Sequence, residues 1–264
     1  MSQQFFNFDG KVVIITGSSS GIGQAAAILF AKSGASVTIH GRSEEGLQKT
    51  TNLILESEVP KERIHSVKGE VTDSITQKAL IEETAKTFGR IDILINNAGG
   101  AFRNDGDQRS MESLDYCLNV NLKAPIALTE LAIPYLEKTK GCIINTSAPG
   151  GQKSFPIIAH ASISRAGLDH FARNYAAILA PMGIRINNLS PGLTDTPAIS
   201  GRYNDIEKMA NFLISQIPLG RMAKPEEMAE FMAFIASEKA AYMTGQIITV
   251  DGGLLIYSPT MKFD

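Results

Sequence analysis

The sequence predicts a single α/β domain built on a doubly wound parallel sheet with helices on both faces. Short apolar runs rich in β-branched residues, beginning with residues 12–15, alternate with helical patterns along the chain. Such runs are typical of parallel strands buried on both faces, and parallel neighbours need crossover helices. The 264 residues contain no linker, repeat or low-complexity stretch. We therefore expect one domain over residues 1–264.

The expected elements follow one another with clear boundaries. Strands are expected at residues 12–15, 36–40, 64–67, 91–95, 142–146, 184–189 and 246–250. Helices are expected at residues 24–34, 43–58, 74–88, 111–137, 163–180 and 224–236. The long helix at 111–137 should bend or restart near Pro125 and Pro134. Residues 195–221 form an excursion with its own short helix at 206–216.

Composition narrows the class of protein. The 25 basic residues nearly balance the 27 acidic ones without a basic cluster, so we expect no nucleic-acid partner. Cys117 and Cys142 stand in apolar patterns without metal-type spacing, so we expect buried thiols in a reducing compartment and no metal. No apolar run reaches membrane-spanning length, and the N-terminus lacks a signal-peptide pattern. These features predict a cytoplasmic protein that does not bind membranes.

A glycine-rich turn joins the first strand to the first helix. Gly17, Gly21 and Gly23 lie in the stretch Thr-Gly-Ser-Ser-Ser-Gly-Ile-Gly. A strand, a glycine turn and a helix in this order bring bare backbone N–H groups and a positive helix end to one point, which suits a phosphate. The alternative is a tight turn without a ligand, because a glycine trio alone is a weak signal.

Arg42 follows the second strand, where dinucleotide-binding folds usually carry an acid for the adenine ribose. No acid occurs over residues 37–43. The planar fork of Arg42 suits a 2′-phosphate, with Ser18 or His40 assisting. The alternative is an exposed arginine that opens the next helix.

Asn119 and Asn121 lie inside the long helical pattern at 111–137. An asparagine inside a helix either has a functional role or is simply exposed to solvent or hydrogen-bonded to the backbone.

Together these residues resemble the short-chain dehydrogenase/reductase family over nearly the whole chain. The matching motifs are Thr16-Gly-Ser-Ser-Ser-Gly-Ile-Gly23, Asn96-Asn-Ala-Gly99, Asn121, Pro191-Gly192 and Val250-Asp-Gly-Gly253. The resemblance implies a Rossmann-type fold and hydride transfer between a nicotinamide and a carbonyl or alcohol. It implies NADP(H) rather than NAD(H), because the acid is missing and Arg42 is present. The cofactor-binding residues that it implies are Gly17, Ser18, Ser20, Gly21, Ile22, Gly23, Arg42, Glu70, Val71, Asn97, Ala98, Gly99, Arg165, Pro191, Gly192 and Thr194.

The departures from the family fall on the catalytic residues. Active members use a serine after the fifth strand, a tyrosine as acid or base, and a lysine four residues after the tyrosine. In the register fixed by downstream residues these positions are Ala148, Ala161 and Arg165, and only Asn121 is retained. Loss of a positioned proton donor typically costs about 100- to 10,000-fold in rate.

Three interpretations follow from this replacement. We favour a protein that binds the cofactor and has lost or strongly reduced oxidoreductase activity. The alternative is an active NADPH-dependent carbonyl reductase or alcohol dehydrogenase with a rebuilt proton relay, using His160 or Ser147. To act as the proton donor, His160 must lie before the start of the helix; otherwise it is a surface or core histidine. The alternative for Ser147 is an ordinary serine in a turn. The third is an engineered catalytic knockout.

Two further expectations concern partners. The resemblance implies a homo-oligomer, a dimer or tetramer, formed through the long helices that start near Met111 and Ile163. The apolar pattern Phe171, Tyr175 and Ile178 is compatible with such a face, although core packing explains it equally well. The excursion at 195–221 would be a lid over a medium-sized, partly apolar small molecule.

Overall fold

A computed structural model describes residues 5–101, 109–200, 211–212 and 214–257 of the chain. The helix predicted at 206–216 lies largely outside these residues, and with it most of the predicted lid. The ends of the excursion are described: Thr194 and Ala223 pair as an isolated parallel β-bridge. The excursion therefore leaves and rejoins the domain at one place.

Seven parallel strands form one sheet in the order β3-β2-β1-β4-β5-β6-β7. The strands are β1 (Val12–Ile15), β2 (Ser36–Gly41), β3 (Ile64–Lys68), β4 (Ile93–Asn96), β5 (Cys142–Thr146), β6 (Arg185–Pro191) and β7 (Ile247–Val250). The order reverses between β1 and β4, because the chain first builds outward to β3 and then returns to the other side of β1. At such a switch point the carboxyl ends of the strands leave room for a ligand.

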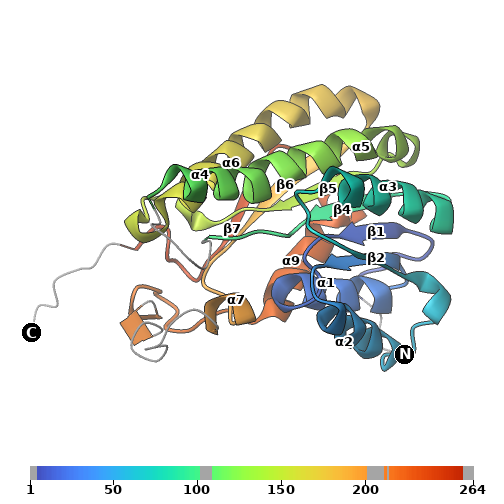
Figure 1. Cartoon of the computed structure of the whole chain (residues 1–264), viewed down its shortest axis with the longest axis horizontal. Helices are drawn as coiled ribbons and strands as arrows, with labels where there is room; N and C mark the ends of the chain where they lie inside the picture. The colour runs from blue at the N-terminus through green and yellow to red at the C-terminus, as the bar shows by residue number, and fades with distance from the viewer. Residues whose placement is uncertain (1–4, 102–108, 201–210, 213, 258–264) are drawn as a thin grey trace, which may run out of the picture.

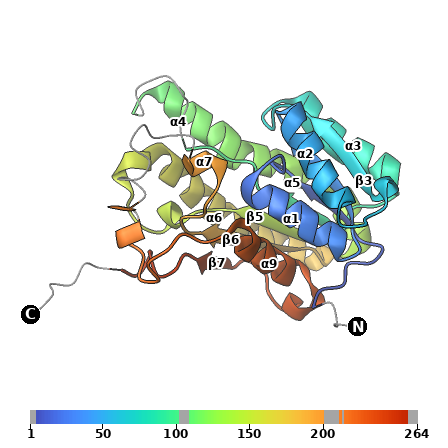
Figure 2. The ribbon, with the colours of Figure 1, turned by 90° about the horizontal axis from the view of Figure 1, so that it is seen from below.

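Helices cover both faces of the sheet, which confirms the predicted fold class. Figure 1 shows one helical layer on each side, and Figure 2 shows the same layers after a quarter turn. One layer holds α1 (Gly21–Lys32), α2 (Glu44–Leu55) and α9 (Pro225–Ala236). The other holds α3 (Ser74–Phe88), α4 (Met111–Leu118), α5 (Ala124–Thr139) and α6 (Ala159–Leu179). A four-residue helix, α7 (Pro197–Ser200), opens the excursion.

The strand pleat divides the core between the two layers. Val13 and Ile15 of β1 pack into the cluster with α1 and α9, whereas Ile14 packs into the cluster with α3, α5 and α6. All three side chains are fully buried. A strand in such a position needs an unbroken apolar run, which is what residues 12–15 supply.

Two helix predictions differ from the structure. The long helix restarts near Pro125 as predicted, through a π-helical turn at Asn119–Lys123 between α4 and α5. It does not restart at Pro134, which lies inside α5 without ending it. Proline removes only its own N–H bond, to the carbonyl of Glu130, which lies on an exposed part of the helix. Helix α6 begins at Ala159 rather than at residue 163, because a 3₁₀ turn at Pro156–Ile158 leads directly into it. Residues 159–162 carry no apolar periodicity to mark that start.

Within the described residues, no helix is both long enough and apolar enough to cross a membrane.

Candidate functional site: the carboxyl edge of the sheet

The glycine turn packs directly against the segment that follows β4. Gly17 and Gly21 have φ angles of +66° and +57°, which favour glycine. A Cβ atom on Gly17 would lie 2.8 Å from Cα of Ala98, and one on Gly23 would lie 2.3 Å from the carbonyl oxygen of Gly17. The spacing of the three glycines is thus required by close backbone approach as well as by the turn.

The N-terminus of α1 is open at this turn. Ser20 occupies the N-cap and is exposed, and its side chain accepts no hydrogen bond from the helix. Gly21, Ile22 and Gly23 form the first turn, so their N–H groups have no partner within the helix. Because an uncapped helix start offers N–H donors and a positive dipole end, the turn fits a phosphate group.

Ser18 and His40 are turned into the protein. Ser18 Oγ donates to the carbonyl of Ile15 at 2.9 Å and accepts from the backbone N–H of His40 at 2.8 Å. His40 Nδ1 accepts from the backbone N–H of Gly17 at 3.3 Å. Burial lowers the pKa of His40 to about 4, against a smaller opposing effect of the Gly69 backbone. In this geometry both side chains fix the glycine turn rather than face a ligand.

Asn97 links three strand ends. Its Nδ2 donates to the carbonyls of Thr16 and Gly17 at 3.0 and 3.1 Å, and Thr146 Oγ1 donates to its Oδ1 at 3.3 Å. In return Thr16 Oγ1 accepts from the backbone N–H groups of Asn97 and Ala98 at 2.9 and 3.0 Å. The sequence analysis did not single out Thr16, although it opens the glycine motif. The network places Ala98 and Gly99 beside the turn.

Arg42 and Glu70 form an exposed ion pair, with 3.6 Å between Nη1 and Oε1. They follow the ends of β2 and β3, respectively, whereas Val71 is buried. No acid stands between Val37 and Ser43, so Arg42 is the charged group at the end of β2. Ser43 accepts from the N–H of Gly46 and caps α2. The helix-opening role is therefore met by Ser43, and Arg42 is presented at the edge of the sheet.

The end of β6 is held against the end of β7. The N–H of Gly192 donates to the carbonyl of Val250 at 2.9 Å, and a Cβ on Gly192 would lie 2.5 Å from Cα of Asp251. Thr194 Oγ1 donates to the carbonyl of Gly192 at 3.0 Å. Pro191 and Thr194 are buried. This segment thus has a defined shape at the same edge of the sheet.

Asn121 is fully buried in the π-helical turn and bonds to the backbone of a different segment. Its Oδ1 accepts from the N–H of Gly100 at 2.9 Å, and its Nδ2 donates to the carbonyl of Gly100 at 2.8 Å and to Ser164 Oγ at 2.9 Å. Of the alternatives that the sequence left open for Asn121, the structure shows hydrogen bonding to the backbone. Asn121 fixes the loop after β4 against α6.

Ala148, Ala161 and Arg165, which stand where the family resemblance leads one to expect serine, tyrosine and lysine, line one cavity of about 190 Å³, which we name the alanine cavity. The structure thus brings these three residues together. The lining residues are Gly99, Gly100, Ala101, Ala148, Gly150, Ile158, Ala161, Ser162 and Arg165. The side chains missing at Ala148 and Ala161 leave open space rather than a repacked core.

Arg165 places a positive charge at this cavity. Its Nη1 donates to the carbonyl of Thr146. The side chain keeps some accessible area because it borders the cavity, but protein surrounds the charged group, and this burial lowers the pKa of Arg165 to about 10. The guanidinium is therefore still charged near neutral pH and holds its proton too firmly to relay it.

Neither His160 nor Ser147 lines the alanine cavity. His160 lies in the first turn of α6, so the condition that it precede the helix is not met. The Ser147 hydroxyl is buried beside Asp169 but does not reach hydrogen-bond geometry, and it lowers the pKa of that carboxyl slightly while burial raises it. Neither side chain is therefore placed to supply a proton in the cavity.

Two hydroxyls near the cavity were missed by the sequence analysis. Ser162 lines it, and its Oγ is buried without a hydrogen-bond partner. Tyr116 lies behind Gly100, because a Cβ on that glycine would come within 2.4 Å of the phenol oxygen. The sequence shows that Ser162 follows Ala161, but the direction of its side chain depends on where α6 begins. No motif in the sequence marked Tyr116 as a site residue.

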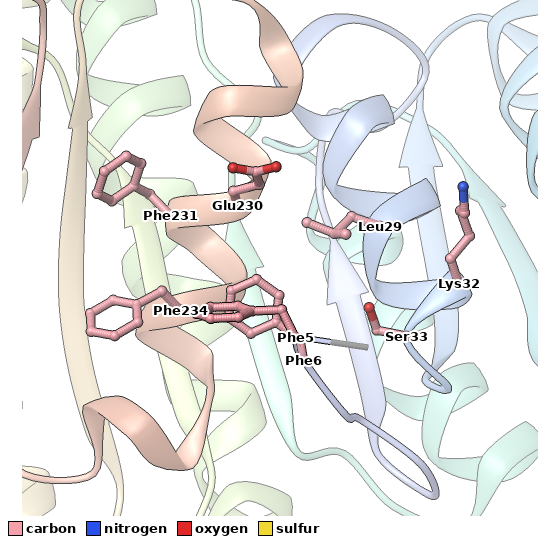
Figure 3. Close-up of a pocket in the computed structure, with 8 residues that line it drawn as sticks. All are labelled: Phe5, Phe6, Leu29, Lys32, Ser33, Glu230, Phe231 and Phe234. Atoms are coloured by element: carbon pink, nitrogen blue, oxygen red, sulfur yellow. The ribbon is translucent and has the colours of Figure 1, made fainter. Parts of the chain in front are cut away.

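A larger hollow lies elsewhere, between the N-terminal segment, α1 and α9. This aromatic groove has a volume of about 510 Å³ and is lined by Phe5, Phe6, Leu29, Lys32, Ser33, Glu230, Phe231 and Phe234. Figure 3 shows Phe5 and Phe6 between α9 and α1, with Leu29 on the side of α1 and with Phe231 and Phe234 extending from α9 away from α1. The groove lies at the end of α1 that is opposite to the glycine turn, so it is separate from the site at the carboxyl edge.

The fold is of the Rossmann class, and its carboxyl edge carries a glycine turn that fits a phosphate group. A family model described as Enoyl-(Acyl carrier protein) reductase matches residues 17–255. The chain belongs to the short-chain dehydrogenase/reductase family, as its motifs predicted.

Relatives match over nearly the full length. A 3-oxoacyl-[acyl-carrier-protein] reductase FabG of Thermotoga maritima is 37% identical over 94% of this chain and 99% of its own. A meso-2,3-butanediol dehydrogenase of Serratia marcescens is 34% identical over 93% and 95%. Among solved structures, a short-chain dehydrogenase/reductase of unknown function from Caenorhabditis elegans, crystallised with cofactor, is 39% identical at a TM-score of 0.90, covering 95% of this chain and 97% of its own. The family is thus one of oxidoreductases.

Proposed function

We propose that this protein binds NADP(H) at the carboxyl edge of the sheet and lacks the ordinary proton relay of its family. The observation that carries the proposal is the alanine cavity, where Ala148 and Ala161 leave open space beside Arg165. The cofactor side of the site is intact, whereas the proton-transfer side is missing.

The glycine turn between β1 and α1 has a shape that fits a dinucleotide. Side chains at Gly17 or Gly23 would collide with backbone, so the bare approach to the helix start is built into the turn. The uncapped N–H groups at Gly21, Ile22 and Gly23 would hold the pyrophosphate. Ala98 and Gly99 would run beneath the cofactor, and Pro191 and Gly192 would hold its nicotinamide end.

The preference for NADP(H) rests on Arg42. Its pairing with Glu70 is exposed on both sides, and such pairs contribute on the order of 1 kcal/mol or less. A dianionic phosphate can therefore displace the carboxylate, and the arginine fork would bind it in two-point fashion. An NAD(H)-preferring site would need an acid where this chain has none.

Reduction of a carbonyl needs a proton on its oxygen as well as a hydride on its carbon. A bound nicotinamide supplies or accepts the hydride. In this chain Ala161 has no group to give the proton, and Arg165 keeps its own. The residues that remain bind and orient the cofactor but do not complete the transfer.

A working carbonyl reductase is the second candidate. It is supported by the unpartnered Ser162 hydroxyl in the cavity and the Tyr116 phenol behind Gly100, rather than by His160 or Ser147. The sequences of the relatives named as reductases and dehydrogenases are also consistent with it.

The experiment is a fluorescence titration with NADPH and NADH, followed by a panel of carbonyl compounds at several pH values. Binding of NADPH without its oxidation supports the binding protein. Turnover of any compound would instead establish the second candidate, and variants Ser162→Ala and Tyr116→Phe would then show which hydroxyl serves. Failure to bind either nucleotide would remove the cofactor assignment.

For partners we propose a homo-oligomer built on α4, α5 and α6, with a small-molecule ligand under residues 195–221. Ile178 on α6 is 54% exposed and Phe171 is buried, while the phenol of Tyr175 donates to Glu130 of α5. An exposed isoleucine beside this ordered pair is consistent with a subunit contact. Light scattering of Ile178→Lys against the unaltered protein tests it, since a monomer in both would reject the proposal.

A further inference from the structure

The alanine cavity combines apolar walls with two unused hydrogen-bond donors. Ala148, Ile158 and Ala161 supply apolar surface. The Ser162 hydroxyl is buried without a partner. The Arg165 guanidinium has five N–H groups, of which the structure shows one bonded, to the carbonyl of Thr146. Buried donors of this kind are costly unless something accepts from them.

The charge of Arg165 is also uncompensated at short range. Within the residues that the structure describes, no carboxylate lies in ion-pair distance of its guanidinium. Asp169, one helical turn further on, acts on Arg165 only over a longer distance, and its Oδ1 accepts from Asn188 Nδ2 at 2.8 Å. None of the described residues that line the cavity is acidic.

The start of α6 adds to the positive character. Ile158 is the N-cap of this 21-residue helix and offers no side-chain acceptor. Ile158, Ala161 and Ser162 all line the cavity, so the first turn of α6 forms part of its wall. A helix start of this length attracts a negative group.

We propose that the alanine cavity is an anion site that binds the carboxylate of a small organic acid. Arg165 and Ser162 Oγ would donate to the carboxylate oxygens, and Ala148, Ile158 and Ala161 would contact a short apolar chain. A planar carboxylate matches the guanidinium fork. At roughly 30 Å³ per water, the volume corresponds to about six waters, enough for a carboxylate with a few carbon atoms.

This proposal rests on the proposed function, because the cavity exists only where the family's proton-transfer side chains are missing. A carboxylate in this place would sit where the family holds a reducible carbonyl, and hydride transfer to a carboxylate is unfavourable. The protein would then bind an acid together with the nucleotide without consuming either, as a sensing or assembly protein requires.

The test measures binding of propionate and benzoate by calorimetry and by thermal shift, at constant ionic strength set with chloride. Propionamide and benzamide serve as neutral probes of the same shape, and inorganic phosphate tests for an anion without an apolar part. The variants are Arg165→Met, which removes the charge, Arg165→Lys, which keeps a charge, Ser162→Ala, and Ala161→Leu, which fills the cavity while leaving Arg165 in place. Circular dichroism shows which variants are folded.

We expect the carboxylates to bind and the amides not to. Arg165→Met and Ala161→Leu should each weaken binding at least about tenfold, while Arg165→Lys should retain part of it. Binding that survives in both variants, or equal binding of acids and amides, would overturn the proposal. If phosphate alone binds, the site takes inorganic anions and the organic-acid assignment fails. NADPH titration of the unaltered protein and of Ala161→Leu separates the outcomes, because neither sample changes Arg165, which is itself an expected cofactor contact. Failure of the unaltered protein to bind NADPH concerns the proposed function and not this cavity.

Discussion

Arg42 Nη1 lies 3.6 Å from Glu70 Oε1, so the arginine that we propose for a 2′-phosphate is paired with an acid that follows the neighbouring strand. The two residues follow β2 and β3, neighbours in the sheet. Since both side chains are exposed, the pair is easily separated. If Arg42 binds a phosphate as we propose, Glu70 competes with that phosphate for the guanidinium.

The first prediction concerns cofactor preference. Arg42→Ala should weaken NADPH binding by about 10- to 100-fold and leave NADH binding nearly unchanged. Glu70→Gln should strengthen NADPH binding a few-fold, most clearly at low salt, because it frees the guanidinium. Fluorescence titration measures both, with Lys49→Ala on the exposed face of α2 as a control for loss of a surface charge. Equal weakening of NADPH and NADH by Arg42→Ala would contradict the role given to Arg42.

The second prediction concerns the missing relay. The triple variant Ala148→Ser, Ala161→Tyr, Arg165→Lys should oxidise NADPH with carbonyl compounds at least about 100-fold faster than the unaltered protein. The alanine cavity has room for the added side chains, and Ser164 and Asn121 already fix the surrounding helix and loop. A variant with Ala161→Phe in place of tyrosine controls for filling the cavity. If the phenylalanine variant were equally active, the proton donor would not be the missing part.

The third prediction concerns pH. His40 has a folded-state pKa of about 4 because it is buried as the neutral ring, against about 6.5 when unfolded. The stability that follows from the neutral ring is therefore fully present above about pH 6.5 and is lost as the pH falls toward 4, by roughly 3 kcal/mol in total. The free energy of unfolding should drop over this range, and NADPH binding should drop with it, because Nδ1 accepts from Gly17 N–H.

His40→Asn isolates this effect. Its amide oxygen can accept from Gly17 in place of Nδ1, and it does not titrate. Carboxyl groups titrate nearby in pH, and burial raises the pKa of Asp169, so the difference between the two proteins is the informative quantity. A pH slope between 6.5 and 4 that is the same in both would rule out His40 as its source.

The fourth prediction concerns the glycine turn. Gly23→Ala would bring a methyl group to 2.3 Å from the Gly17 carbonyl oxygen and 2.5 Å from Asn97 Nδ2, which also bond to each other at 3.1 Å. We expect a loss of about 1–3 kcal/mol in the free energy of unfolding and at least a tenfold loss in NADPH affinity, by about 1.4 kcal/mol. Gly167→Ala in α6 is the matched control, because its new methyl group would meet only the flexible end of Leu122. Unchanged NADPH binding by Gly23→Ala would show that the cofactor does not use this turn.

The sequence by itself determined the fold class and the family, and it predicted that Ala148, Ala161 and Arg165 occupy the family's catalytic positions. These follow from local information: β-branched runs such as residues 12–15 are uninterrupted because both faces are buried, and motif spacing fixes register without knowledge of contacts. The predicted boundaries of α3, residues 74–88, agree with the structure because Asp73 caps the helix and Gly89 ends it in the left-handed conformation.

Tertiary structure alone decided what each polar side chain faces. The helix start at Ala159 turned His160 away and Ser162 toward the cavity, and neighbouring helix positions differ by about 100°. Ser18 and His40 bond inward, Glu70 pairs with Arg42, and Asn121 bonds to Gly100, 21 residues away in the chain. Such contacts join segments that are far apart in sequence, and the pattern of residue types does not show where each side chain points. The cavity between Ala148 and Ala161 likewise depends on how the end of β5 and the start of α6 are packed together.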